Sequence, residues 1–233
     1  MRRSVLKTLA VTGADATGSM GDDTPIAVMS QQSRSLYDYF RQAFAQVTNP
    51  PIDPLRERMV MSLVSQIGLE GNLFDLSADS ARQVLLSSPV LSQRKLRQLL
   101  ALPHLADRQI RIDLYYDEEI GLRKALEDIC RQAEHAVREG AAMVLLSDRY
   151  PQPGLTQIHA LLATGAIHAH LTRTQLRCDC NLLVETGTAR DAHHFACLIG
   201  FGATAVYPFL SYQTLFDMNQ RGEIKGGENE TVH

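Results

Sequence analysis

The histidines are the first residues whose chemistry suggests a site. Four of them stand in two close pairs, His168 with His170 and His193 with His194. Side chains on one helix share a face when they are three or four residues apart, so neither pair forms a ready metal clamp. Glu185 would complete a site only if the fold gathered both pairs. The spacing therefore favours histidines that bond to backbone or carboxylate groups over a tetrahedral zinc site.

The cysteines form no zinc or redox motif. Cys130, Cys178, Cys180 and Cys197 contain no Cys-x-x-Cys pair, which is the spacing that zinc ribbons and thioredoxin-type motifs need. Cys130 and Cys197 fall on the apolar faces of expected helices, where free cysteine packs as a small hydrophobe. We expect reduced thiols, in agreement with a cytoplasmic location.

Signatures of nucleophilic catalysis and phosphate binding are missing from the sequence. Ser147 follows an apolar run, but no Gly-x-Ser-x-Gly elbow surrounds it. The glycine-rich stretches 18–21 and 200–202 match neither a dinucleotide fingerprint nor a P-loop. We therefore predict no catalytic, cofactor-binding or metal-binding residues.

Size and charge restrict the class of protein. The chain has 233 residues, a formal net charge of -3, 45% hydrophobic residues and 21% charged residues. These values are ordinary for a globular domain, and the charge gives no basic field that would attract nucleic acid or an anionic membrane. No apolar run is long enough to span a bilayer, and the first residues lack the apolar stretch of a signal peptide. A cytoplasmic protein is expected.

Strand and helix signals alternate four times in the second half of the chain. Continuous apolar runs, as at 142–146 and 181–184, are typical of strands that are covered on both faces. Expected strands cover 110–114, 142–146, 181–184 and 205–207, and expected helices cover 118–139, 155–174, 191–199 and 211–219. We predict an α/β fold of four consecutive β-α units, forming a parallel sheet or partial barrel covered by helices.

A loop-rich helical segment is expected to precede these units. Glycines make the first thirty residues loop-like, and three prolines within 50–54 make a stiff extended connection. Expected helices cover 33–45, 55–63 and 92–100, with a brief one beginning at Ser77. We predict one domain over 1–220, with a loop-rich part at 1–107 and a β-α repeat at 108–220. The tail 221–233 lacks apolar content and is expected to be disordered.

Polar residues directly follow two of the apolar strands. Asp148 and Arg149 follow the strand at 142–146, and Glu185 follows the strand at 181–184. Working groups in parallel α/β structures gather on loops after the carboxyl ends of strands. The alternative is that Asp148 and Arg149 pair locally and cap the next helix.

Several stretches resemble the central domain of glutamate synthase large chains. The most specific are 18–28 (Gly-Ser-Met-Gly-Asp-Asp-Thr-Pro-Ile-Ala-Val), 36–40 (Leu-Tyr-Asp-Tyr-Phe) and the proline-rich block 44–54. The resemblance continues at 146–149 (Leu-Ser-Asp-Arg), 165–168 (Gly-Ala-Ile-His), 184–187 (Val-Glu-Thr-Gly), 193–196 (His-His-Phe-Ala) and 200–203 (Gly-Phe-Gly-Ala). It covers the chain from about residue 18 to residue 215.

The resemblance implies a role within a larger enzyme. That family makes two glutamates from glutamine and 2-oxoglutarate. An amidotransferase domain with an N-terminal cysteine nucleophile releases ammonia, and a flavin barrel with FMN and a 3Fe-4S cluster reduces 2-iminoglutarate. The central domain joins the two and helps to form the internal ammonia route. The electron donor is a nicotinamide cofactor, through a donor subunit, or ferredoxin.

The resemblance further implies that this chain is a connecting domain that catalyses neither half-reaction. It begins with Met1-Arg2, so the nucleophilic cysteine is missing, and it ends before any flavin barrel. Its cysteines do not match cluster ligands. It departs from the family at Tyr207-Pro208, where Asn-Pro is expected, at His168-Ala169-His170, where three histidines are usual, and in the short loop 150–155.

The candidate residues of such a connector would organise loops or contact flanking domains. They are Asp22, Asp23, Asn49, Asp53, Asp148, Arg149, Glu185, His193 and His194. The aromatic residues Tyr37, Tyr39 and Phe40 are expected to be buried within the domain.

Two other functions stay open from the sequence. A free-standing metal-dependent enzyme would use Asp148, Glu185, His193 and His194. A regulatory module that binds a small anion would use Arg149 and Arg190.

Overall fold

A four-stranded parallel sheet forms the centre of the protein. The computed structural model describes residues 3–12, 21, 24–41, 62–69, 74 and 83–224. The sheet has the order β3-β5-β7-β8, and its strands are β3 (Gln109–Asp113), β5 (Met143–Ser147), β7 (Asn181–Glu185) and β8 (Ala205–Tyr207). The predicted α/β fold with a parallel sheet is confirmed.

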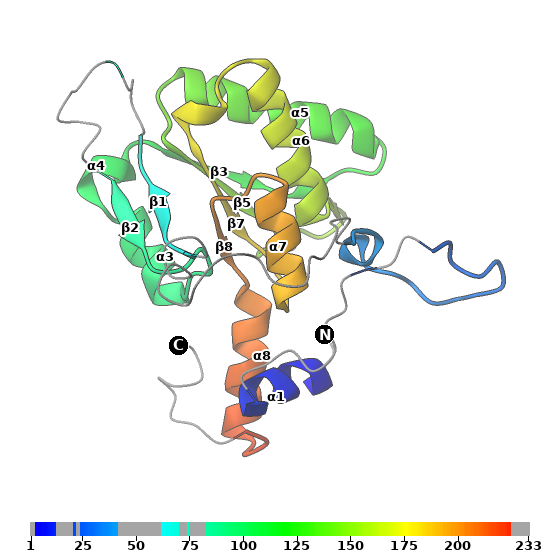
Figure 1. Ribbon diagram of the computed structural model, residues 1–233. Helices are drawn as coiled ribbons and strands as arrows, with labels where there is room; N and C mark the ends of the chain where they lie inside the picture. Colours follow the sequence, from blue (N-terminus) through cyan, green and yellow to red (C-terminus); the bar gives the residue numbers. More distant parts are fainter. Residues whose placement is uncertain are drawn as a thin grey trace, which may run out of the picture.

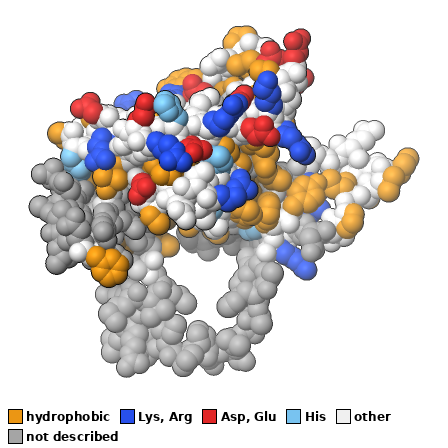
Figure 2. All heavy atoms as spheres, turned by 90° about the horizontal axis from the view of Figure 1, so that it is seen from above, with side chains coloured by type: hydrophobic (Ala, Val, Ile, Leu, Met, Phe, Trp, Pro, Cys, Tyr) orange, Lys and Arg blue, Asp and Glu red, His pale blue; other side chains and the backbone are white. Residues whose placement is uncertain are grey.

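Three helices cover one face of the sheet, as Figure 1 shows. They are α5 (Leu122–Arg138), α6 (Ala160–Arg173) and α7 (Ala192–Gly200), each connecting one strand to the next. Val144, Leu146 and Val184 pack against this layer in the larger of the hydrophobic clusters. Seen from above in Figure 2, the outer surface carries Lys and Arg interspersed with Asp and Glu, without a region of one sign.

A hairpin and two short helices cover part of the other face. These elements are β1 (Ser65–Ile67), which pairs antiparallel with β2 (Val84–Leu86), then α3 (Gln93–Leu100) and α4 (Pro103–Ala106). Ile67, Leu96 and Leu99 meet Leu145 and Leu183 in a second cluster. All five residues of β5 and all five of β7 are buried, because the alternating side chains of each strand enter both clusters.

The last helix leaves the sheet and packs on the first. Figure 1 shows α8 (Phe209–Gln220) extending from β8 and crossing α1 (Arg3–Thr12). Leu6, Met218 and Ile224 form a small buried cluster there. The expectation that the first thirty residues are loop-like is therefore wrong for α1, and Ile224 lies buried within the tail for which disorder was predicted. Residues 225–233 lie outside the described part.

The predicted helix at 33–45 is a single 3-10 turn in the described residues. This turn, η1, covers Leu36–Tyr39, and Phe40 after it is extended, with φ -100° and ψ 127°. Ser35 precedes the turn, and its backbone N–H donates to the Asp38 carboxylate at 3.1 Å. The local hydrogen bond thus favours a turn over continued helix. Of the expected helix at 55–63, only residues 62 and 63 are described, and they are not helical. The brief helix expected from Ser77 begins outside the described residues.

Two other helices begin later than predicted. The helix expected from 118 begins at Leu122, after Gly121 at φ 81°. The helix expected from 155 begins at Ala160, because Thr156–Gln157 forms β6 and pairs antiparallel with β4 (Tyr115–Tyr116). Backbone pairing between two loops here outweighs the local helical pattern. The helix at 92–100 is confirmed, with the Ser92 side chain capping α3.

The described helices do not reach membrane-spanning length with sufficient apolar character. A short 3-10 turn, η3 (Arg177–Asp179), completes the fold between α6 and β7. Burial raises the pKa of the Cys180 thiol beside it to about 11, so this cysteine is a protonated packing residue at neutral pH.

Two neighbouring glycines provide a test of the turn between α7 and β8. Gly202 has φ 112°, and a Cβ at that position would overlap the imidazole of His168. Gly200, at the end of α7, has open space for a Cβ. We predict that Gly202→Ala lowers the free energy of unfolding by about 2 kcal/mol or more. Gly200→Ala should leave it unchanged or raise it by up to about 1 kcal/mol. Urea unfolding of both variants measures this; equal effects would contradict the turn geometry.

Candidate functional site

The register of the sheet aligns a row of polar residues at its carboxyl edge. Asp113 lies opposite Ser147, Ser147 opposite Glu185, and Glu185 opposite Tyr207. Each is the last residue of its strand, so the row marks the point where the strands give way to loops. This is the edge at which parallel α/β proteins place their working groups.

Glu185 is the acidic centre of this row. It is only 4% exposed, and its two carboxylate oxygens accept from Ser147 Oγ at 2.6 Å and from Arg149 Nη1 at 2.9 Å. The Arg149 guanidinium also lies 5.8 Å from the Tyr207 ring centre and 5.6 Å from that of Phe209. A buried carboxylate needs such paired donors, because leaving it unpaired costs several kcal/mol.

Asp148 binds a different set of groups. Its carboxylate accepts from Thr186 Oγ1 at 2.5 Å, from the Gly187 backbone N–H at 2.8 Å and from Gln157 Nε2 at 2.8 Å. Burial raises the pKa of this carboxyl, while the three hydrogen bonds act in the opposite direction. Asp148 thus binds β6 and the loop after β7, whereas Arg149 binds Glu185 at the end of β7, in place of the local pair considered from the sequence.

Tyr37 brings the N-terminal segment onto the same edge. This fully buried side chain comes from η1, and its hydroxyl lies 3.0 Å from Thr188 Oγ1. Its ring stacks on His194 with centroids 4.2 Å apart and meets the edge of His159 at 4.9 Å. The His193 Nε2 donates to the Tyr37 carbonyl at 2.9 Å. The expected burial holds for Tyr37, whereas Tyr39 is 40% exposed.

The histidines separate into structural pairs. His168 accepts from Arg177 Nε at 3.0 Å, and His170 pairs with Glu134 at 2.6 Å, whereas His193 and His194 contact Tyr37. In the part of the chain that the structure describes, no three His, Cys, Asp or Glu side chains come together as metal ligands. These contacts suit structural roles for the histidines.

The structure also places the remaining candidates. Arg190 donates to Asp191 at 3.3 Å, and the Asp191 side chain caps α7 by accepting from the His194 backbone N–H at 3.1 Å. Asp22, Asp23, Asn49 and Asp53 lie outside the described residues, so their predicted role stays a prediction.

Sequence reasoning missed several members of this edge. Thr186 and Thr188 link Asp148 to Tyr37 through hydroxyl contacts of 2.5, 2.8 and 3.0 Å. The Tyr115 hydroxyl donates to the Asp148 carbonyl at 2.5 Å. The sequence shows the threonine hydroxyls that follow β7, so they could have been noticed. It does not show that Tyr37, which is 151 residues from Thr188, is their partner.

The arrangement can position loops. Asp148 and Glu185 direct their oxygens at neighbouring loops and strands, and the resulting contacts tie η1, β6 and the loops after β5 and β7 together. Fold and site thus define a β-α repeat domain whose carboxyl edge is internally hydrogen-bonded.

Comparisons with known proteins identify the family. The whole chain, residues 1–233, matches the family described as the glutamate synthase central domain. It is 45% identical over 214 residues to ferredoxin-dependent glutamate synthase 2, chloroplastic, of Arabidopsis thaliana, covering 90% of this chain and 13% of that protein. It is 42% identical over 220 residues to the glutamate synthase [NADPH] large chain of Bacillus subtilis, covering 94% of this chain and 14% of that protein.

A third relative gives the same result. Glutamate synthase [NADH] of Saccharomyces cerevisiae is 39% identical over 233 residues, which is 97% of this chain and 11% of that protein. The chain belongs to the glutamate synthase central domain family. It spans only 11% to 14% of the length of these three relatives.

The Glu185 contacts predict a large effect of a small substitution. Glu185→Gln keeps the shape of the side chain. It removes the negative charge that Arg149 faces and one of the two oxygens that accept hydrogen bonds. We expect the free energy of unfolding to fall by about 1–3 kcal/mol. Glu139→Gln is the matched control, since Glu139 is 67% exposed in its ion pair with His135 and should cost less than about 1 kcal/mol. Urea unfolding that gives equal values for the two variants would contradict the buried role of Glu185.

His194 predicts a dependence of stability on pH. The residue is 2% exposed, and burial lowers its pKa to about 4, although Asp191 acts in the opposite direction. Because the unfolded pKa is higher, at about 6.5, the contribution of neutral His194 is complete above pH 6.5 and is lost as the pH falls toward 4. The loss is at most about 1.4 kcal/mol per pH unit.

Comparison with a variant isolates this residue. His159 has a lowered pKa through burial, and Asp148 has a raised pKa through burial, but both are present in the parent chain and in His194→Gln. The difference in free energy of unfolding between the two proteins should therefore shrink between pH 6.5 and 4. A difference that is constant over this range would show that His194 does not titrate as described.

Proposed function

We propose that this chain is the non-catalytic connecting domain of a glutamate synthase large chain. It links a glutamine amidotransferase domain to an FMN and iron-sulfur synthase domain of the same chain and forms part of the wall of the intramolecular ammonia route. The observation that carries the proposal is a match to the central-domain family over 1–233, combined with coverage of only 11% to 14% of three relatives.

The structure supports a positioning role for the domain. A domain that joins two catalytic parts must keep its surface loops in fixed positions, and the contacts of Asp148, Thr188 and Tyr37 join loops that are distant in the sequence. A route for ammonia must exclude water without holding ammonia tightly. Polar groups that already bind one another suit such a wall better than unpaired charges, which would attract water.

The described residues do not fit the cofactors of the parent enzyme. The pocket that contains Glu185 has a volume of about 300 Å³, at the lower end of the range for ligand sites and small for a molecule of the size of FMN. A 3Fe-4S cluster is held by cysteine thiolates, and the described cysteines are not gathered with other ligands into a group of three. We assign FMN and the 3Fe-4S cluster to the rest of the large chain.

The proposal extends to partners and location. The flanking domains are the direct partners, and the parent receives electrons from a donor subunit or from ferredoxin. The three relatives are named for ferredoxin, NADPH and NADH respectively, so membership of the family does not select the donor. We propose a cytoplasmic location for the parent.

A hybrid large chain tests the proposal. The corresponding segment of the Bacillus subtilis large chain, 42% identical, would be replaced by this chain, and in a control by a flexible Gly-Ser linker. We expect the hybrid to consume glutamine and 2-oxoglutarate in equal amounts. The linker protein should lose this equality and release ammonia, because its catalytic domains are no longer held together. Flavin absorbance verifies that both proteins are assembled.

Two results would contradict the proposal. One is coupled glutamate formation by the linker protein at the rate of the hybrid. The other is glutaminase turnover or flavin binding by the isolated 233-residue chain. Stoichiometric zinc or iron in the purified chain would instead favour a metal-dependent enzyme.

A further inference from the structure

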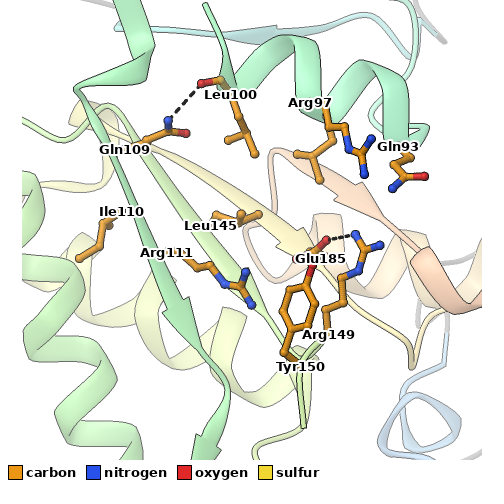
Figure 3. A pocket seen from close by; sticks show the side chains of 11 residues that line it. Gln93, Arg97, Leu100, Gln109, Ile110, Arg111, Leu145, Arg149, Tyr150 and Glu185 are labelled. Carbon is orange, nitrogen blue, oxygen red and sulfur yellow. Dashed lines mark hydrogen bonds and ion pairs between the residues drawn. The ribbon is translucent and has the colours of Figure 1, made fainter.

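A pocket lies on the sheet face opposite the three covering helices. It has a volume of about 300 Å³ and lies between α3 and the strands β3, β5 and β7. In Figure 3, Arg97 comes from α3, Arg111 from β3, and Arg149 with Tyr150 from the loop after β5. The volume is at the small end of the range for ligand sites, about 300–1,000 Å³.

The pocket carries more positive than negative charge. Arg97, Arg111 and Arg149 line it together with a single carboxylate, that of Glu185. Glu185 already pairs with Arg149 at 2.9 Å. The Arg111 guanidinium pairs in turn with Asp113 at 2.8 Å. Among the described residues that line the pocket, Arg97 is therefore the cation whose charge is not balanced by a carboxylate, and the pocket suits an anion.

The two other arginines differ in how they are held. Arg111 donates to Asp113 at 2.8 Å and to Ser147 at 3.3 Å, and the Arg111 and Asp113 side chains are 37% and 44% exposed. A pair with this exposure contributes little and leaves Arg111 able to bind a second anion. Within the described residues, the Arg97 guanidinium has no ion-pair or hydrogen-bond partner.

The floor of the pocket is apolar. Leu96, Leu100 and Leu145 form it, and the Tyr150 ring lies 4.7 Å from the Arg111 guanidinium. Hydrocarbon that covers such a floor is stabilised by its removal from water. A ligand that combines a charged head with a short hydrocarbon body would use both the arginines and the floor.

We propose that this pocket binds a small aliphatic carboxylate, with Arg97 and Arg111 as the residues that recognise it. Guanidinium groups match carboxylates in a two-bond, planar geometry that lysine cannot offer. A short dicarboxylate offers one carboxylate to each cation and its hydrocarbon to the apolar floor. Inorganic phosphate has the charge but lacks the hydrocarbon body, so it binds more weakly. The inference is independent of the connecting role, since it concerns a ligand and not the neighbouring domains.

Isothermal titration of the 233-residue chain tests the proposal with three probes: glutarate, glutamate and inorganic phosphate. We expect saturable binding of one glutarate with a Kd of about 1 mM or tighter, and weaker binding of phosphate. Glutamate tests whether an ammonium group is accepted near Glu185. If glutamate binds more tightly than glutarate, the carboxylate site stands and the preferred ligand is an amino acid.

Matched arginine variants locate the binding. Arg97→Gln and Arg111→Gln should each raise the Kd for glutarate at least about tenfold, and Arg97→Lys should raise it several-fold. Arg123→Gln is the control, because Arg123 lines the separate groove between α5 and α6, and it should leave the Kd unchanged. Circular dichroism verifies that each variant is folded. Arg97 is exposed, so its substitution should disturb folding least.

Three results would overturn the proposal. They are no saturable heat with glutarate and glutamate up to about ten times the expected Kd, phosphate binding as tight as that of glutarate, or equal effects of Arg97→Gln and Arg123→Gln. None of these depends on coupled glutamate formation, so failure here and failure of the connecting role are distinguishable.

Discussion

The hydrogen bonding of one buried carboxylate organises the loop edge of this domain. Asp148 follows β5, yet its oxygens bind Gln157 in β6 and Thr186 and Gly187 after β7. Thr186 then contacts Thr188, which contacts the Tyr37 hydroxyl. These three hydrogen bonds offset the cost of burying the carboxylate. The parts of the chain that supply them are therefore held in one arrangement.

The two faces of the sheet are covered differently. The α5, α6 and α7 layer packs on alternate residues of β5 and β7, and both strands are buried throughout. The opposite face is covered by the β1-β2 hairpin and α3, and it keeps an open pocket with Arg97, Arg111 and Arg149. The packed sheet and its hydrogen-bonded carboxyl edge together suit a domain that sets the positions of its neighbours within a longer chain.

The sequence predicts the repeat half of the fold well, for local reasons. Buried strands such as Met143–Ser147 appear as continuous apolar runs, and Ser92 and Asp191 indicate helix starts through their capping side chains. Helix boundaries fail where distant backbone pairs intervene. Thr156–Gln157 pairs with Tyr115–Tyr116, and two-residue strands of this kind leave no periodic pattern.

The site was predictable only in part, and the reason is sequence distance. Asp148, Arg149 and Glu185 could be found because they stand where apolar runs end, Asp148 and Arg149 directly after β5 and Glu185 as the last residue of β7. Their partners could not be assigned, since Arg149 and Glu185 are 36 residues apart and Tyr37 and Thr188 are 151 apart. No local pattern encodes a contact across such a separation, so the contribution of Tyr37 to the edge became visible only in the fold.

Hydrogen exchange of an Asp148→Asn chain tests the central role of this carboxylate most directly. Asparagine offers one acceptor oxygen in place of two, so the bonds from Thr186 and Gly187 cannot both be kept. We expect the backbone amides at 186–188 and at 36–40 to exchange faster together, while those of β5 and β7 stay protected. Faster exchange confined to the residues beside position 148, with 36–40 unchanged, would contradict it.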